Sequence, residues 1–361
     1  MTVLHVFAVI AGTVLLLVVS WETFETLVLP RRVDRRLRLT RLYFRSTWKV
    51  WSAIGRGGSG PRRETYLSVY APLSLLFLFA GWALGVILSF ALIQWGLQLA
   101  TVGHRAGGFG TYLYFSATTF WTLGLGDVQP QTSPGRALTA IEAGLGFAYL
   151  ALAISYLPVM YQAFSRREAT ISMLDQWAGS PPSALEIYRR ASQFDDLASV
   201  NGLLADWERW SSELLESHLS YPILAWFRSQ HDNQSWLAAL TTILDASALA
   251  LAGVDGVSPW QARRTFAMAR HAAVDLAQVL ANRTEPTAHM RPQDRTSVRE
   301  ALEAAGVTLH PRLEERVAPF RQMYEPYVHA LSHRLQMPLP PFAGGVGGPD
   351  DWESSGWTIP G

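Results

Sequence analysis

The sequence predicts an all-α protein with a membrane part and a soluble part. Its 361 residues are 49% hydrophobic and 16% charged, which is apolar for a soluble protein but too polar for one lying wholly in a membrane. Three apolar segments, residues 3–29, 68–100 and 135–162, are long enough to cross a bilayer as helices. Beyond Glu168 strand-like alternation is scarce and apolar residues recur at helical spacing. Cysteine is absent, which excludes disulfides and thiolate metal sites.

Residues 1–30 are predicted to form an N-terminal transmembrane helix. No basic residue precedes the apolar run, and a series of arginines follows it, which is the reverse of the charge order in a secretory signal. The positive-inside rule then predicts a retained helix with its N-terminus outside the cell. The chain is therefore expected in the cell inner (plasma) membrane as a multi-pass protein.

Residues 31–66 are predicted to form a basic cytoplasmic segment. Between Arg31 and Glu64 eleven basic residues stand against two acidic ones, which gives +9 and leaves −8 for the rest of the chain. Arg35, Arg38 and Arg41 repeat every third residue, as in a voltage-sensing helix, but such a helix needs its arginines in an apolar span inside a helix bundle. An amphipathic helix on the anionic lipid of the inner leaflet is the favoured interpretation.

Residues 67–165 contain the second and third spans and a short apolar segment between them. Thr111–Trp121 is too short to cross a bilayer, so a re-entrant helix is expected. The stretch Thr122–Asp127 follows it with the pattern Thr-x-Gly-x-Gly-Asp. A dehydrated cation needs rings of oxygen atoms, and backbone carbonyls supply them where glycines at alternate positions permit the geometry. This segment therefore indicates a cation pathway.

Thr122–Asp127 resembles the selectivity filter of potassium channels, whose usual form is Thr-Val-Gly-Tyr-Gly-Asp. The likeness extends over residues 68–165, where the turn into the family's inner helix and its hinge glycine match Pro130, Thr132, Gly135, Arg136 and Gly146. It implies a pore domain built from an outer helix, a re-entrant pore helix with its filter, and an inner helix. It also implies a homotetramer, because each chain lines only a quarter of such a pore.

The resemblance assigns roles residue by residue. It implies that K⁺ is the permeant ion, that no cofactor is needed, and that the ion ligands are Thr122, Leu123, Gly124, Leu125 and Gly126. It also implies that Gly146 is a hinge, that the region of Pro158 forms the gate, and that Phe147, Leu150 and Ile154 line the cavity.

The filter departs from the family pattern in its support. Leu125 replaces the usual Tyr, Trp121 replaces a Thr, and Thr118 stands where the family has a carboxylate behind the filter. Asp127 is then expected to bond to Tyr114 or to Thr118. This looser support bears on the strictness of selection for potassium.

Two features of the third span have open interpretations. Glu142 is an ionisable residue inside an apolar span. It either concentrates cations behind the filter or is a neutral carboxyl bonded to pore-helix hydroxyls. Gly144 and Gly146 are either hinge glycines or close-packing glycines.

Residues 166–337 are predicted to form a helical cytoplasmic domain, and residues 338–361 a flexible tail rich in Gly and Pro. The expected helices are 183–195, 198–217, 234–252, 259–282, 296–305 and 311–335. His218, His231, Asp232, His271 and His289 lack the usual spacing of metal ligands, so core or solvent-facing histidines are expected. No dinucleotide, phosphate-loop, nucleophile-elbow or zinc motif appears, so neither an enzyme nor a nucleic-acid partner is expected. The domain is expected to assemble or gate the tetramer, with a regulator that the sequence does not identify.

The predicted function is a potassium-selective channel subunit. Two alternatives stay open at this point. One is a weakly selective cation channel of the same fold, and the other is a non-conducting membrane-tethered scaffold that acts through its helical domain.

Overall fold

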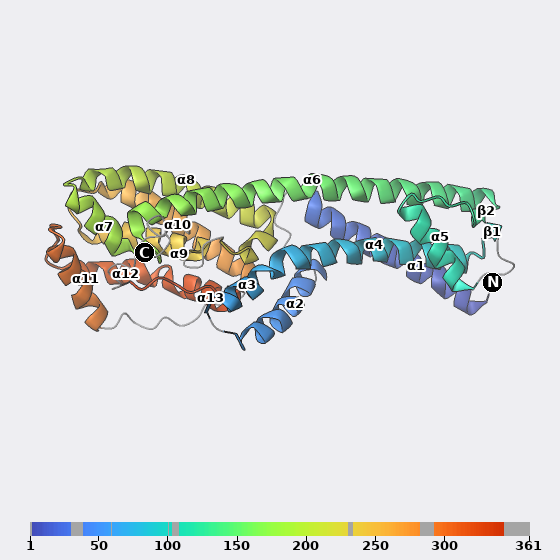
Figure 1. Cartoon of the computed structure of the whole chain (residues 1–361), viewed down its shortest axis with the longest axis horizontal. Helices are drawn as coiled ribbons and strands as arrows, with labels where there is room; N and C mark the ends of the chain where they lie inside the picture. Colours follow the sequence, from blue (N-terminus) through green and yellow to red (C-terminus); the bar gives the residue numbers. More distant parts are fainter. Residues whose placement is uncertain are drawn as a thin grey trace, which may run out of the picture. The chain divides into compact units, whose positions relative to one another are not determined.

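The computed structural model describes residues 2–29, 39–58, 60–99, 101–102, 108–229, 234–281 and 292–342. The described chain is helical apart from one short pair of strands (Figure 1). It divides into two compact units. The first contains Met1–Gly57 and Val69–Tyr161, and the second contains Gly58–Ser68 and Gln162–Gly361.

In the first unit, α1 (Val3–Leu27) packs along α4 (Tyr70–Gly96) (Figure 1). The two backbones approach closely where one helix has a glycine. A Cβ on Gly12 would lie 2.7 Å from the Ser89 carbonyl oxygen, and one on Gly96 would lie 2.6 Å from that of His5. Small residues at such crossings allow the van der Waals contact that holds helices together in lipid.

The helix α2 (Leu39–Gly55) is tied to both of these helices. The Glu22 carboxylate at the end of α1 accepts hydrogen bonds from the backbone N–H groups of Leu39 and Thr40, at 3.2 and 3.1 Å. An anion at a helix N-terminus satisfies free N–H groups and complements the helix dipole. On the other side, the Tyr70 hydroxyl donates to the Phe44 carbonyl oxygen at 3.0 Å.

The segment predicted at 31–66 is divided between the two units. Arg35 and Arg38 lie outside the described residues, and α2 belongs to the first unit. The short helix α3 (Gly60–Ser68) belongs to the second unit, where Glu64 forms an ion pair with Arg228 at 3.1 Å.

The remaining elements of the first unit surround a short loop. The helix α5 (Phe109–Phe120) packs on α4, and its 12 residues are too few to cross a bilayer. The strands β1 (Thr101–Val102) and β2 (Gln129–Pro130) pair antiparallel, which joins the chain before α5 to the chain after the loop.

The helix α6 (Ser133–Ala178) is longer than predicted. The sequence interpretation ended the third span at Ser165–Arg167, but the helix continues through these residues for 46 residues in all and contains Pro158. The reason is that Arg167 is not at a solvated helix end. It is buried in the second unit and donates to the carbonyl oxygens of Leu224 and Phe227, at 2.9 and 2.8 Å.

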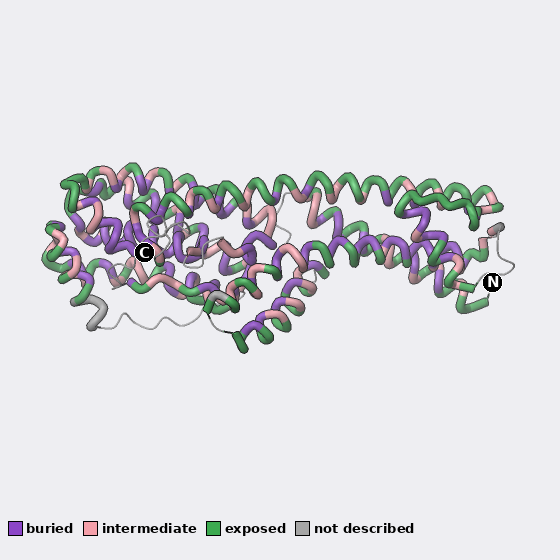
Figure 2. The backbone as a smooth tube through the Cα atoms, viewed as in Figure 1, coloured by how far each residue is buried: buried purple, intermediate pink, exposed green. Residues whose placement is uncertain are grey.

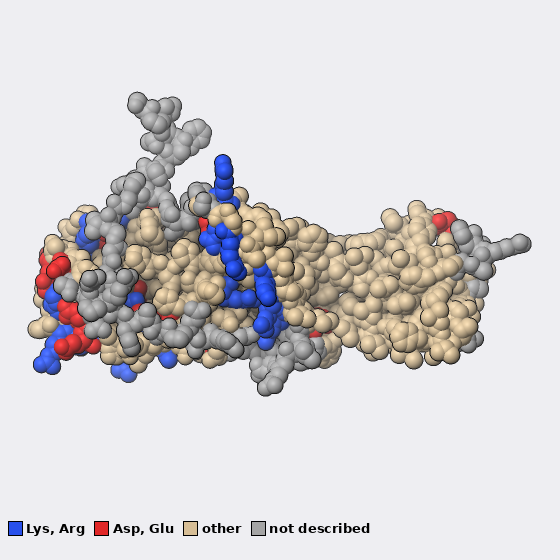
Figure 3. Space-filling view, turned by 90° about the horizontal axis from the view of Figure 1, so that it is seen from below, with Lys and Arg blue, Asp and Glu red and all other residues tan. Residues whose placement is uncertain are grey.

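Three described helices are long and apolar enough to cross a membrane: α1, α4 together with the residues before it, and α6. The face drawn in Figure 3 is almost free of charged side chains over the part that contains α1, α4 and α5.

The second unit is built around a central apolar helix, α9 (Trp236–Ala252), in which every residue except Leu251 is buried (Figure 2). Helices that contact α9 or its neighbours are α7 (Ala184–Gln193), α8 (Val200–Ser220), α10 (Pro259–Leu280), α11 (Pro292–Ala304), α12 (Leu313–Gln322) and α13 (Glu325–Leu335). Two 3₁₀ turns, η1 (Leu197–Ser199) and η2 (Pro222–Trp226), precede and follow α8. Six large apolar residues of α8 are all buried: Leu203, Leu204, Trp207, Trp210, Leu214 and Leu215.

The single helix predicted at 311–335 is wrong, because the chain breaks between α12 and α13. Pro326 stands in the first turn of α13 and has no N–H to continue an earlier helix. The tail predicted to begin at Pro338 is packed in its described part. Phe342 is buried, and its ring centroid lies 3.7 Å from the Arg321 guanidinium carbon. Residues 343–361 lie outside the described residues.

His218 is a core histidine beside Arg167. Its Nε2 accepts from Arg167 Nη1 at 3.1 Å, and its Nδ1–H donates to the Leu214 carbonyl oxygen at 2.9 Å. Burial lowers the pKa of His218 well below its usual value, and the positive charge of Arg167 lowers it further. The described residues contain no cluster of metal-ligating side chains, while His231, Asp232 and His289 lie outside them.

This histidine predicts a pH dependence of stability. The pKa of His218 is lower in the folded chain than in the unfolded chain, so below about pH 6.5 the unfolded chain binds more protons. As the pH decreases below this value, the free energy of unfolding should therefore fall by up to about 1.4 kcal/mol per pH unit. His218→Gln keeps one acceptor and one donor but does not titrate. Thermal unfolding of the full chain in nanodiscs, followed by circular dichroism between about pH 7.5 and 5, should show a steeper loss of stability in the wild type than in the variant. Parallel curves would contradict this.

Candidate functional site

The loop between α5 and β2 has an alternating backbone. Thr122, Gly124 and Gly126 have positive φ, at 54°, 55° and 79°, whereas Leu123 and Leu125 do not. In an ordinary strand successive carbonyls point to opposite sides. Alternation of the sign of φ turns successive peptide groups toward one side, as a carbonyl-lined ion pathway requires.

Thr122 adopts its positive φ without the freedom of glycine. A non-glycine residue in this region costs about 1–2 kcal/mol. Such strain persists where surrounding contacts enforce it and is typical of functional sites. Here the contacts come from the end of α5, because Thr122 N–H donates to the Thr119 carbonyl oxygen at 3.0 Å and Leu123 N–H donates to that of Thr118 at 2.8 Å.

The outer end of the loop has its own polar contacts. The Gln129 side chain donates to the Gly126 carbonyl oxygen at 3.0 Å. The Asp127 carboxylate accepts from the Val128 backbone N–H at 3.1 Å. Of the two partners expected for Asp127, Tyr114 is the one that interacts with it electrostatically. The Thr118 hydroxyl instead donates to the Phe115 carbonyl oxygen at 3.0 Å, within α5.

The predicted ion pathway is open on the single chain. Leu123 and Leu125 are 62% and 64% exposed, and Trp121 lies beside them, in edge contact with the Phe120 ring at 5.1 Å. The residues predicted to line a cavity are also exposed on α6: Phe147, Leu150 and Ile154. One chain therefore presents a surface and does not enclose a pathway.

Glu142 is fully buried behind this loop, between three helices. Its Oε2 accepts from the Gln94 amide of α4 at 3.0 Å, and its Oε1 contacts the Ser116 hydroxyl of α5. The Ser116 hydroxyl also lies 2.7 Å from the Ile87 carbonyl oxygen. The single proton of the Ser116 hydroxyl can be donated to only one of these two oxygen atoms. If Glu142 is protonated, it donates to the Ser116 oxygen, and Ser116 donates to the Ile87 carbonyl, so that every group has a partner. This geometry matches a neutral carboxyl bonded to a pore-helix hydroxyl.

Gln94 and Ser116 were not singled out from the sequence. The signal that could have found them is that both are polar residues in apolar segments, where an unpaired polar group is costly.

Gly146 contacts the end of α5. A Cβ on Gly146 would lie 2.1 Å from the Phe120 carbonyl oxygen, whereas one on Gly144 would meet nothing within 4 Å. The Phe120 side chain is buried beside Tyr149, with ring centroids 5.8 Å apart. Gly146 therefore lets α6 pack directly on the last turn before the loop.

Comparison with known proteins places an ion-channel domain in this part of the chain. Residues 74–163 match the model of a family described as ion channel. The chain is also similar to YdjJ of Bacillus subtilis (strain 168), an uncharacterized membrane protein, with 22% identity over 148 residues. That match covers 41% of this chain and 42% of the relative, so it spans less than half of either protein. No solved structure matches. The predicted fold class, an all-helical membrane protein with a channel pore domain and further helices after it, is confirmed.

The two glycines of α6 form a matched pair for a test of packing. Gly146→Ala should destabilise the protein by about 1–3 kcal/mol, because the added methyl group meets the Phe120 carbonyl and the backbone must shift. Gly144→Ala should be neutral or slightly stabilising, since it adds helix propensity in open space. Thermal unfolding of both variants in the same detergent checks this. Equal midpoints for the two would argue against the close contact.

The Glu142 cluster predicts a difference between two substitutions. Glu142→Gln can accept from Gln94 and donate to Ser116, so it should leave stability nearly unchanged. Glu142→Val leaves those partners unsatisfied and should cost about 1–3 kcal/mol for each buried polar group. A Gln variant as unstable as the Val variant, in the same unfolding assay, would show that the carboxyl is ionised.

Proposed function

We propose that this protein is a subunit of a potassium-selective channel, in which four copies surround one pathway. The ion-channel domain at residues 74–163 supports this, and the alternation of φ at Thr122, Gly124 and Gly126 is the observation that carries it. Carbonyl oxygens of residues 122–126 would replace the water of the ion, and K⁺ would pass from one ring to the next. The exposure of the loop on a single chain favours closure of the pathway by further copies.

The gate is proposed near Pro158. This residue lies inside α6 and cannot donate a hydrogen bond to the Ile154 carbonyl, so the helix is weakest there. Gly146 is held against Phe120, which favours a packing role over a hinge. Bending at Pro158 would then open or close the cavity lined by Phe147, Leu150 and Ile154.

The proposed orientation has the N-terminus outside and the helical unit in the cytoplasm. It rests on the basic residues that follow α1 and the third span, among them Arg41, Arg45 and Arg166. The basic face of α2 would rest on anionic lipid of the inner leaflet.

A cysteine placed at the exposed Val50 of this cysteine-free chain should label only from the cytoplasmic side; labelling from outside would reverse the orientation.

A weakly selective cation channel is the second candidate. It is favoured by Leu125, whose apolar side chain offers no hydrogen bond to brace the loop at the position where potassium channels usually have Tyr.

Currents through the purified protein in a planar bilayer, with K⁺ on one side and Na⁺ on the other, separate the candidates. A reversal potential near that of K⁺ supports the first, a value near zero supports the second, and no current would leave the scaffold function.

Gly124→Ala should abolish the potassium current without preventing assembly. Its φ of 55° is strained for any L-residue with a Cβ, although there is open space around it. Gly110→Ala, in the first turns of α5 and also in open space, is the matched control and should conduct normally. Native mass spectrometry of both variants checks that four copies still associate. A normal current in Gly124→Ala would rule out the ion pathway assigned here.

A further inference from the structure

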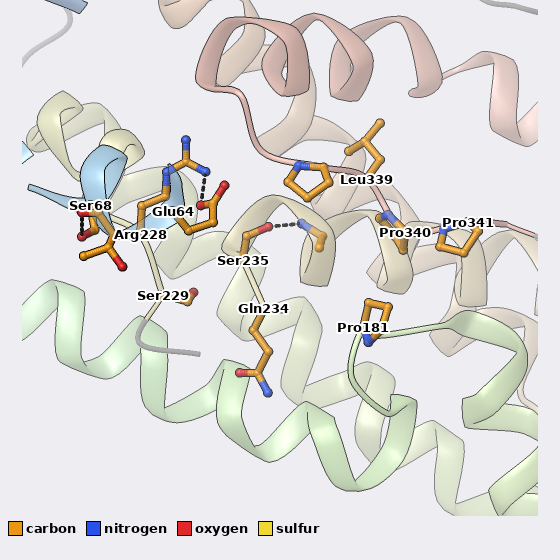
Figure 4. Close-up of a pocket in the computed structure, with 13 residues that line it drawn as sticks. Glu64, Ser68, Pro181, Arg228, Ser229, Gln234, Ser235, Leu339, Pro340 and Pro341 are labelled. Atoms are coloured by element: carbon orange, nitrogen blue, oxygen red, sulfur yellow. Dashed lines mark hydrogen bonds and ion pairs between the residues drawn. The ribbon is translucent and has the colours of Figure 1, made fainter. Parts of the chain in front are cut away.

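The second unit contains a cavity of about 510 Å³ that the proposed channel does not use. It lies among α3, the start of α9, and the segment Pro338–Pro341 after α13 (Figure 4). Arg228 and Glu64 lie at one end of it, and Pro181, Pro340 and Pro341 lie at the other (Figure 4). Its volume is in the usual range for small-molecule sites.

Two residues that line this cavity hold buried polar atoms whose hydrogen bonds are not made. Within the described part of the chain, neither the Arg228 Nε nor the Ser229 hydroxyl has a partner. The Arg228 side chain is only 7% exposed, and its two Nη atoms are engaged by Glu64 and by the backbone carbonyls of Leu335 and Gln336. A buried donor without an acceptor is costly, so an acceptor supplied by a ligand would be stabilising.

The N-terminus of α9 adds a second source of positive potential. Ser235 caps this helix by accepting from the Ala238 N–H at 3.0 Å, and both residues line the cavity. The N-terminal end of a 17-residue helix favours an anion through its dipole. Arg63, which donates to Gln336 at 2.7 Å, adds a further positive charge on α3.

The rest of the wall is apolar and is held in place. Four prolines line the cavity: Pro181, Pro338, Pro340 and Pro341. The segment that carries three of them is fastened by the next residue, Phe342, against Arg321. Arg321 is itself paired with the buried Asp245 of α9 at 3.3 Å.

We propose that this cavity binds a small organic anion. Its phosphate or carboxylate group would lie between the N-terminus of α9 and the pair Arg228–Ser229, and a flat apolar body would rest on the prolines. One wall is α3, which is followed after a single residue by α4, so binding acts on the chain segment that enters the second span. Such binding does not depend on conduction by the channel.

The test measures binding of 4-fluorophenyl phosphate to the full chain in phosphatidylcholine nanodiscs, from the broadening of the ¹⁹F resonance of this probe. The wild type should broaden the resonance of the phosphate. It should not broaden the resonance of 4-fluorophenol, which lacks the anionic group. Ser229→Ala should weaken binding about 3- to 10-fold through the loss of one hydrogen bond. Arg228→Gln should weaken it at least about tenfold.

Two further variants distinguish a specific loss of binding from a loss that is caused by misfolding. Ala238→Leu fills the cavity without touching its polar groups and should abolish binding, whereas Arg209→Gln, at a 73% exposed side chain of the same unit, should leave it unchanged. The same phosphate chemistry occurs on soluble molecules and on lipid headgroups. Loss of probe binding when the nanodiscs contain phosphatidic acid would identify a headgroup as the ligand, and retained binding would identify a soluble one. No broadening by the wild type, or equal broadening by Ser229→Ala and Ala238→Leu, would overturn the proposal.

Discussion

The packing of the Gly146 backbone on the Phe120 carbonyl is the contact on which the first unit depends. It holds the long helix α6 against the last turn of α5, where the strained loop begins. The loop cannot maintain its alternating φ on its own, because Thr122 is unfavourable in the left-handed region. The end of α5 must therefore be fixed for the loop to keep its shape, and α6 provides that fixed surface.

The buried Glu142 adds a polar counterpart to this apolar contact. Through Gln94 and Ser116 it joins α4, α5 and α6 by hydrogen bonds in a region where apolar packing alone has little directional preference. A carboxyl group enclosed in this way contributes order to the helix arrangement. It has no exposure on the single chain, so its effect on an ion would have to act through the structure it supports.

The two units are joined by continuous chain at several points. The helix α6 begins in the first unit and ends in the second, where Arg167 is enclosed by His218 and by backbone carbonyls. The helix α3 belongs to the second unit and leads directly into α4. Two of the three candidate spans are therefore continuous with helices of the second unit.

Much of this protein was determined by the sequence alone. Apolar segments of membrane length, the short helix between them and the spacing of Thr122, Gly124 and Gly126 are local properties, since they follow from composition, period and the freedom of glycine. Apart from the break between α12 and α13, the helices of the second unit were predicted with small errors at their ends for the same reason. Tertiary structure decided the rest. It settled that α6 continues past Arg167, because distant carbonyls accept its hydrogen bonds, and that Gly146, but not Gly144, lies in a close contact. It also brought Gln94, Ser116 and Glu142 together, and placed Glu64 beside Arg228. Such pairings depend on which helix faces cross, and no local pattern in the chain encodes which of several buried polar residues will meet.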